Sequence, residues 1–409
     1  MRAADRGQAT VDYLAVVLVA ALAMTAAGAV WSDPEKLGGS VSRALARALC
    51  LVGGGFCDAD LKPCVTAKDT DARHWHVSVV FARFGKDDVL VREQRSDGTV
   101  ALTRTKTTEG GLDHGWGAKG SVGGRGFDLS ADLQVLDREG KGAVYVARDA
   151  AEADRLQARI VAGDGDLPRP AFTLGSSRVQ AELSAKLDLP KLTGELAVRP
   201  AAEEGMKRDL ATGRTTIYLE GGLGGGASLV AGRRGASGTA EVAERYAVVL
   251  DETGRARELV VTARGRLTGA GDLPGIVAPM DGRLRASAQA GAGVEWSTES
   301  HLDLDDVATA RTVDAFVEEL RHPQLYDTLT GRPSDAVRAA IEQRGTIEAR
   351  TYAVREVKGG VEGSVGAVAK LGGARERTTT TARLLAAVSR GPDGAWRMRG
   401  DCVADHARA

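Results

Sequence analysis

The sequence predicts an α+β protein, mostly antiparallel β. An N-terminal transmembrane helix is expected to precede long β-meander or hairpin sheets with two or three packed helices. Residues 13–31 carry no charge, and that length just spans a bilayer as a helix. From about residue 75 the chain alternates apolar and polar residues, which is typical of half-buried strands. Helical periodicity returns only in short segments, at residues 150–161, 307–320 and 335–343.

The composition is that of an ordinary folded body. Of 409 residues, 43% are hydrophobic and 27% are charged, and the formal net charge is −1. Such a balance gives no overall attraction to nucleic acid or to anionic lipid. Aromatic residues make up 4%, which argues against a stacking platform for single-stranded nucleic acid. We therefore expect no nucleic-acid partner, and no small-molecule ligand or cofactor can be identified.

The residues before the apolar run form a short motif, RGQATVDY, at positions 6–13. It resembles the leaders of Tad/Flp-type prepilins and TadE-like pseudopilins. The resemblance implies that a prepilin peptidase cuts between Gly7 and Gln8. It also implies that Asp12, where the family usually has Glu, and Tyr13 take part in assembly with other pilin-like subunits.

Two other interpretations of the N-terminus stay open. Residues 27–29 read Ala-Gly-Ala and could be the cleavage site of a secretory signal. Alternatively, residues 13–31 form an uncut anchor in the lipid bilayer. All three interpretations send the rest of the chain across the membrane. We therefore expect a single-pass protein of the cell membrane with an extracytoplasmic body, or a body released or carried on a surface filament.

Four cysteines occur, and none forms a C-x-x-C pair, so a zinc site is not expected. An even count in an exported chain favours two disulfides. Three pairings are possible; we favour a local bridge between Cys50 and Cys57 and a long one between Cys64 and Cys402.

The chain divides into four expected units. Residues 1–31 are the pilin-like leader and transmembrane helix, and residues 32–70 are a juxtamembrane helix with a cysteine-containing linker. Residues 71–166 form a first β-meander with a helix, and residues 167–409 form a second, larger β-rich unit with helices. Turn sequences such as Asp97-Gly98 separate the strands.

A search for catalytic or metal-binding residues finds no complete set. His74 and His76 share one strand face, but no nearby ligands in the sequence complete a metal site. Residues 115–120 fit G-x-G-x-x-G, but the following sequence is too rich in glycine for the helix that dinucleotide binding needs. The acidic cluster at residues 303–306 is better explained by helix capping than by calcium. We therefore expect no enzyme activity and no metal.

The favoured function is a membrane-tethered surface protein with a binding or structural role, linked to a Tad-type pilus or secretion assembly. The alternative is a lipid-binding or membrane-acting β protein that resembles pore-forming hairpins. Small residues at every other position of 221–230 and 361–371 suggest this alternative, although they also suit strands packed closely against a neighbouring layer. An exported enzyme with an unrecognised site is a third possibility.

Overall fold

The computed structural model describes most of the chain after residue 61. The described residues are 62–79, 82–122, 125–189, 192–231, 234–271, 279–280, 284–306, 309–314, 335–365 and 371–403.

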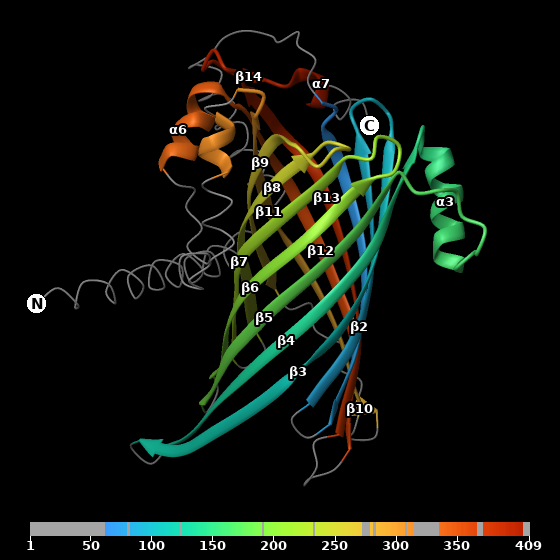
Figure 1. Ribbon diagram of the computed structural model, residues 1–409. Helices are drawn as coiled ribbons and strands as arrows, with labels where there is room; N and C mark the ends of the chain where they lie inside the picture. The colour runs from blue at the N-terminus through green and yellow to red at the C-terminus, as the bar shows by residue number, and fades with distance from the viewer. Residues whose placement is uncertain are drawn as a thin grey trace, which may run out of the picture.

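Twelve strands form a closed antiparallel barrel (Figure 1). Each strand pairs with the next one along the chain, and the last strand pairs with the first. Two short strands, β10 and β14, add to β11 and β13. The barrel strands are β1 (Val65–Val79), β2 (Ala82–Arg95), β3 (Val100–Val122), β4 (Arg125–Ala147), β5 (Phe172–Leu189), β6 (Leu192–Asp209), β7 (Thr215–Ala231), β8 (Arg234–Leu250), β9 (Ala256–Gly271), β11 (Leu284–Asp303), β12 (Thr346–Val365) and β13 (Leu371–Arg390); the additional strands are β10 (Pro279–Met280) and β14 (Trp396–Met398).

The barrel closes at a seam between β1 and β13. Their register runs without interruption from Ala67 opposite Arg383 to Val79 opposite Leu371. Closure leaves neither β1 nor β13 as a free edge, and so removes the unpaired backbone groups that an open sheet would expose.

Short turns set the register of the hairpins at the upper end of the barrel. Gly98 and Gly254 both have a φ of 84°, a left-handed conformation that glycine adopts without a steric penalty. Between β8 and β9, the Asp251 carboxylate accepts hydrogen bonds from the backbone N–H groups of Thr253 (2.9 Å) and Arg255 (3.0 Å). The chain therefore reverses at this turn with its polar backbone groups satisfied.

Helix α3 (Ala150–Ala162) lies outside the barrel at its upper end (Figure 1). Asp149 caps it by accepting a hydrogen bond from the backbone N–H of Glu152 at 2.8 Å, as the sequence predicts. Its apolar residues pack on strand residues that face outward. The buried cluster consists of Leu90, Val100, Leu102, Ala147, Ala153, Leu156 and Ile160. Helix α3 thus covers the upper parts of β2, β3 and β4.

Helix α6 (Asp335–Arg344) covers a second outer area, at the upper ends of β8, β9 and β11. The buried residues there are Tyr246, Leu259, Val261, Leu302, Leu304, Val313, Val337 and Ile341. A third, very short helix, α7 (Gly400–Val403), follows β14 at the upper mouth of the barrel.

The expected fold class is wrong in its architecture. The body is a closed all-β barrel, not an α+β arrangement with helices covering one face of open sheets. Strands on both sides of the expected boundary at residues 166–167 belong to one sheet, since β4 pairs with β5. Alternation along a strand predicts its type, but it does not predict that strands 300 residues apart will pair.

The expected N-terminal helix at residues 13–31 lies outside the described residues, as does most of the expected helix at 307–320. Within the described part of the chain, no helix combines the length and the hydropathy that a membrane crossing requires.

Candidate functional site

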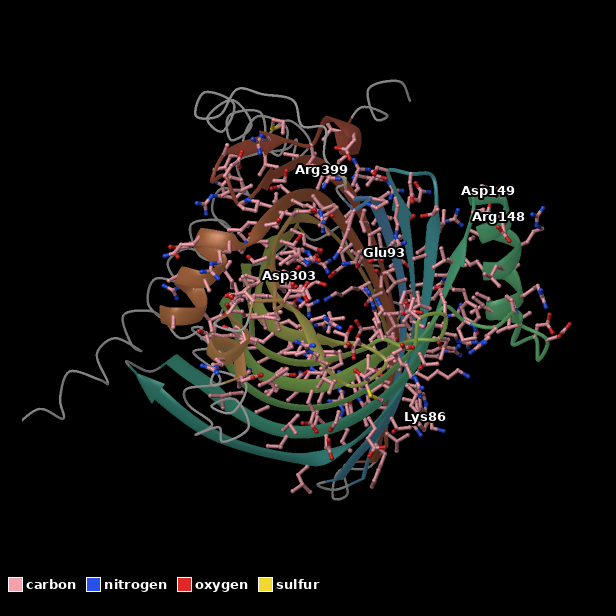
Figure 2. All side chains as sticks on the ribbon, turned by 45° about the horizontal axis from the view of Figure 1, so that its top comes forward. Lys86, Glu93, Arg148, Asp149, Asp303 and Arg399 are labelled. Carbon is pink, nitrogen blue, oxygen red and sulfur yellow. A yellow bond between two sulfur atoms is a disulfide. The ribbon has the colours of Figure 1, made fainter. Side chains whose placement is uncertain are left out.

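The register assigns each strand residue to the inner or the outer face of the barrel. Leu102 packs under α3 and therefore points outward, together with its partner Tyr145. Successive side chains alternate between faces, so the odd-numbered residues of β3, such as Glu109, point inward. Figure 2 shows the same alternation on β2, where Glu93 lies on the inner side of the strands and Lys86 on the outer side.

The inner face buries charged side chains. Glu109, Glu220 and Glu348 are exposed by only 5–6%, and all three occupy inward positions. Buried carboxylates are stable when they are paired with cations. Each of these three has an arginine partner.

One cluster of paired charges lies on the inner face of β1 to β4. The Glu109 carboxylate lies 2.8 Å from Nε of Arg83 and 2.6 Å from Nη2 of Arg138. His74 contacts the Asp87 carboxylate through Nδ1. The other ring nitrogen of His74, Nε2, lies 3.2 Å from Nη2 of Arg83. The five side chains form one network across four neighbouring strands.

This network changes the conclusion about His74 drawn from the sequence. His74, Asp87 and Glu109 each offer a ligand atom, and these atoms lie within 4.8 Å of one another. This grouping could not be predicted from the sequence, because Glu109 is 35 residues from His74 and reaches it only through strand pairing. Both guanidinium groups already occupy the Glu109 carboxylate, so the residues present fit an ion-pair network better than a metal site.

Other inner ion pairs connect strands that are not neighbours. Lys68 of β1 lies 3.2 Å from Glu295 of β11, although β13 and β12 lie between these strands. Arg266 of β9 reaches past β11 to Glu356 of β12 at 2.6 Å. These contacts cross the inside of the barrel between strands that are not paired, so side chains fill part of its interior.

At the upper mouth, eight charged groups follow one another with alternating sign. We call this set the mouth ladder. Arg399 contacts Glu348 at 3.1 Å, and Arg350 joins Glu348 to Glu299, the latter at 3.5 Å. In order, the members are Asp401, Arg399, Glu348, Arg350, Glu299, His301, Glu258 and Lys62.

His301 is the titratable centre of the mouth ladder. Its Nε2 lies 2.8 Å from Glu299 and its Nδ1 lies 2.6 Å from Glu258. Burial alone would lower the pKa of His301, but hydrogen bonds and charge from the two carboxylates outweigh it and raise the pKa to about 9. His301 is therefore a cation at neutral pH, and the ladder is electrically balanced.

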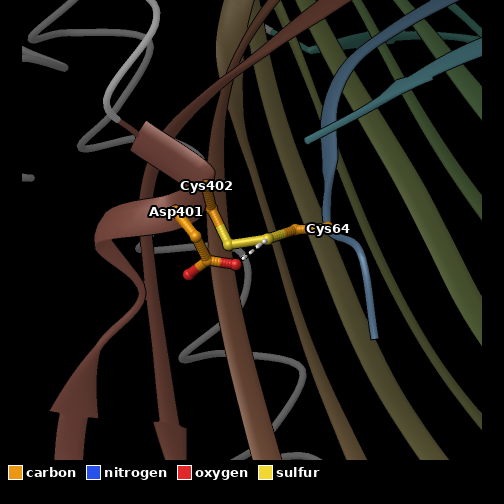
Figure 3. Close-up of side chains that lie close together, drawn as sticks. All are labelled: Cys64, Asp401 and Cys402. Atoms are coloured by element: carbon orange, nitrogen blue, oxygen red, sulfur yellow. Dashed lines mark hydrogen bonds between the residues drawn. A yellow bond between two sulfur atoms is a disulfide. The ribbon is translucent and has the colours of Figure 1, made fainter. Parts of the chain in front are cut away.

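A disulfide fastens the C-terminal segment to the start of β1 beside the mouth ladder. Cys64 is joined to Cys402, with 5.8 Å between their Cα atoms (Figure 3). This disulfide is one of the two bridges favoured from the sequence. The other, between Cys50 and Cys57, lies outside the described residues. Arg399 is exposed by only 2% and donates a hydrogen bond to the carbonyl of Lys62 at 2.9 Å.

The outer face carries exposed apolar side chains. Apart from Val146, which points inward, and Val161, which lies on α3, every large apolar side chain of the described residues that is strongly exposed occupies an outward strand position. They are Trp75, Phe84, Leu112, Val135, Val179, Leu183, Leu196, Met206, Ile217, Val242, Trp296, Val357 and Val361. The described body therefore resembles a soluble protein turned inside out, with charges within and hydrocarbon outside.

Two parts of the outer face differ. We define the apolar wall as the outer face of β5 to β9 and β11. Its described charged side chains lie in the upper parts of the strands: Glu204, Arg208, Glu244 and Arg257. Below them the outward residues whose side chains are described are aliphatic, small or hydroxylic, apart from Trp296 and Pro200.

We define the charged wall as the outer face of β12, β13 and β1 to β4. Apolar residues remain near its lower end, including Trp75, Phe84 and Val361. Beside and above them the outward positions carry charges of both signs. These are Arg355, Arg375, Arg377, Arg383, Asp69, Asp71, Arg73, Lys86, Asp88, Arg92, Arg104, Lys106, Asp137, Glu139 and Lys141.

Within the described residues, the remaining sequence motifs take no part in these features. Gly7, Gln8, Asp12 and Tyr13 lie outside the described residues. The G-x-G-x-x-G at 115–120 lies inside strand β3, which continues to Val122, so no helix follows it. In the acidic cluster at 303–306, the last carboxylate, that of Asp306, accepts hydrogen bonds from the backbone N–H and the hydroxyl of Thr309 (3.0 and 2.8 Å).

No family model matches the chain, and no curated protein is similar to it in sequence. Several solved structures resemble it. The β domain of the Bordetella autotransporter BrkA is 10% identical, with 76% of this chain and 98% of that chain covered and a TM-score of 0.26. The transport unit of the autotransporter AIDA-I from Escherichia coli is 9% identical, with 85% and 98% covered and a TM-score of 0.20.

The toluene transporter TodX from Pseudomonas putida is 9% identical, with 82% and 97% covered and a TM-score of 0.15. Scores this low do not establish a shared fold with any of the three.

The expected function and localisation need correction. A pilin-like protein held by a single helix in the cell membrane is wrong as a description of this chain, because its body is itself a closed β-barrel with an apolar outer face. The expectation of a β-rich body is confirmed, whereas the description as a pilin-like protein with a transmembrane helix is not. The physical reason is that the alternating strands place their apolar side outward.

Proposed function

We propose that the protein is an integral membrane β-barrel that crosses the bilayer with its strands. The observation that carries the proposal is the distribution of side chains. Carboxylates such as Glu109 and Glu220 are buried in ion pairs inside the barrel, while leucines and valines are exposed outside it. Closed barrels and helices are the structures that satisfy every backbone hydrogen bond in lipid.

The dimensions agree with this proposal. A spanning strand needs about 9–11 residues when it is tilted by about 45°, and the strands of the apolar wall have 16–20 residues. They are therefore long enough to cross a bilayer and to extend beyond it. The membrane-spanning segments are the lower parts of the strands. The upper ends, where α3 and α6 cover the outer face and the mouth ladder lies within, are outside the bilayer.

The lumen contains ion pairs that join non-neighbouring strands, such as Lys68–Glu295, and the upper mouth holds the C-terminal segment. This arrangement supports a barrel with a restricted interior, in which charge pairs brace the walls against each other. A role in passing large polar cargo does not follow from it.

Two neighbouring residues in the middle of β8 provide a matched test of membrane insertion. Val242 faces outward and is 41% exposed, whereas Ala243 faces inward at the same depth. An arginine on the lipid face costs about 2–4 kcal/mol near the middle of the bilayer, but much less in the lumen. We expect Val242→Arg to reduce insertion into phospholipid vesicles strongly, and Ala243→Arg to leave it near the level of the unmodified protein.

The measurement is flotation with vesicles together with protection of the strands from added protease. Equal insertion of the two variants would remove the basis of the proposal. So would an unmodified, folded barrel that stays in the aqueous phase.

A further inference from the structure

The charged wall has a feature that the lipid-facing role leaves unexplained. On β13 the outward positions from Gly373 to Arg383 carry three arginines, Arg375, Arg377 and Arg383, and no acidic residue. On β4 the outward positions include the acidic pair Asp137 and Glu139. A basic row and an acidic row thus lie on either side of β2, each two strands away from it.

The two strands next to β2 also carry rows of opposite charge, but here the acidic row is on the β13 side of β2 and the basic row is on the β4 side. Outward Asp69 and Asp71 lie on β1, whereas outward Arg104 and Lys106 lie on β3. Apart from Arg73 on β1 and Lys141 on β4, each charged row on one side of β2 therefore matches a row of opposite sign on the other side. A two-fold rotation about an axis through β2 brings the basic row of β13 opposite the acidic row of β4, and the acids of β1 opposite the bases of β3.

Pairing within the chain leaves several of these groups available. Arg377 pairs with Asp71 at 2.8 Å, Arg383 with Asp69 at 2.9 Å, and Arg104 with Asp88 at 2.7 Å. Among the described residues, Lys86, Lys106, Asp137, Glu139 and Arg375 have no ion-pair partner, and all five are exposed. Charges facing lipid without partners are unfavourable, and α3 covers only the upper part of this surface.

We propose that this surface, the outer face of β13, β1, β2, β3 and β4 below α3, is the interface with a second copy of the chain in the membrane. The inference rests on the proposed function, because lipid is what makes the uncovered charges costly. In the dimer the basic row of each copy lies against the acidic row of the other. The two apolar walls then face outward and present a continuous hydrocarbon surface to the bilayer.

Charge reversal gives a test with an internal rescue. Variant A carries Arg375→Glu and Arg377→Glu, and variant B carries Asp137→Arg and Glu139→Arg. In a dimer of A with itself both contacts oppose acid to acid, and in a dimer of B with itself both oppose base to base. In a mixed dimer of A and B, both contacts again join opposite signs.

The experiment uses the full chain in phospholipid vesicles and reads association by energy transfer between labelled copies. We expect the unmodified protein to associate, A and B alone to lose at least tenfold in association, and the A–B mixture to regain most of it. Glu204→Arg, an outward reversal on the apolar wall near its upper end, is the control and should not change association.

A monomeric unmodified protein in the vesicles overturns the dimer, and so does undiminished association of A and B. Failure of the A–B mixture to recover overturns the proposed pairing of rows. Vesicle flotation of the same samples is recorded separately. A barrel that never enters the vesicles disproves the membrane role itself, which is a different outcome from a barrel that inserts as a monomer.

Discussion

The apolar wall and the charged wall are built from the same kind of strand but are held together differently. The apolar wall consists of consecutive hairpins whose outward side chains are largely uncharged. The charged wall contains the seam, where β1 meets β13, and there outward ion pairs link the two ends of the chain: Asp71–Arg377 and Asp69–Arg383. Strands that follow each other in the chain are held in register by the turn between them. The seam has no such turn, so specific contacts such as ion pairs must hold it.

The largest expected effect concerns the seam. The Cys64–Cys402 disulfide closes a loop with a sequence separation of 338 residues, and the loop-entropy model assigns such a bridge about 5 kcal/mol. We expect Cys64→Ala/Cys402→Ala to lower the free energy of unfolding by about that amount. Urea titration of the variant and of the reduced unmodified protein measures it. Unchanged midpoints in both would show that strand pairing alone holds the seam.

The next effect compares the inner face of the charged wall with the outer face of the apolar wall. Glu109→Ala leaves Arg83 and Arg138 without the carboxylate that both contact, and breaking a buried ion pair in this way costs about 3–5 kcal/mol. Glu204→Ala, on the outer face of β6, is the control and should change the free energy of unfolding by less than about 0.5 kcal/mol. Similar losses for the two variants would contradict the assigned inner and outer faces.

The third prediction concerns the mouth ladder, which joins the walls where β11 meets β12. The folded-state pKa of His301 is raised from 6.5 to about 9. A raised histidine pKa stabilises the fold fully below pH 6.5, and the stabilisation is lost as the pH rises through about 9. We expect a decline on the order of 2 kcal/mol between these values.

Unfolding titrations at pH 6 and pH 9 measure this decline, and His301→Gln should flatten it. A decline of the same size in His301→Gln would assign the pH dependence to another group.

The smallest effect lies within the apolar wall. A Cβ atom added at Gly265 would lie 2.0 Å from the Trp296 ring, whereas one added at Gly269 would meet nothing within 4 Å. Both glycines point outward on β9. We expect Gly265→Ala to cost about 1–2 kcal/mol because the ring must shift, and Gly269→Ala to be near neutral. Tryptophan fluorescence should shift in the first variant only.

Local features of the fold were predictable from the sequence. The cap at Asp149, the helix that follows it and the turn at Asp97-Gly98 depend on residues within four positions of each other. The helix at 335–343 was predicted for the same reason and is confirmed as α6.

Closure of the barrel and the inner ion pairs were not predictable in this way. Lys68 and Glu295 are 227 residues apart, and Arg266 and Glu356 are 90 residues apart. No local pattern relates such residues. A signal nevertheless existed in the alternation itself. On β9, Arg264 and Arg266 alternate with Gly265 and Leu267, and we assumed that the polar side faced water.

Period-two alternation determines that the two faces of a strand differ, but not which face is inside. That choice depends on the solvent around the finished barrel. In water the apolar face turns inward, and in lipid it turns outward. The sequence was interpreted as the first case, whereas the described strands have their apolar side outward.

The seam between β1 and β13 also has a consequence for how the molecule is made. Until that pairing forms, the hairpins make a curled ribbon with two unpaired edges, and both edges can recruit strands from other chains. Most other neighbouring strands meet over short connections. The connections from β4 to β5, from β9 to β11 and from β11 to β12 are longer, but the seam must bring together residues about 300 positions apart. Joining ends so distant is entropically slow. Assembly should therefore wait on its last step, and a chain truncated before β13 should accumulate as an aggregating ribbon.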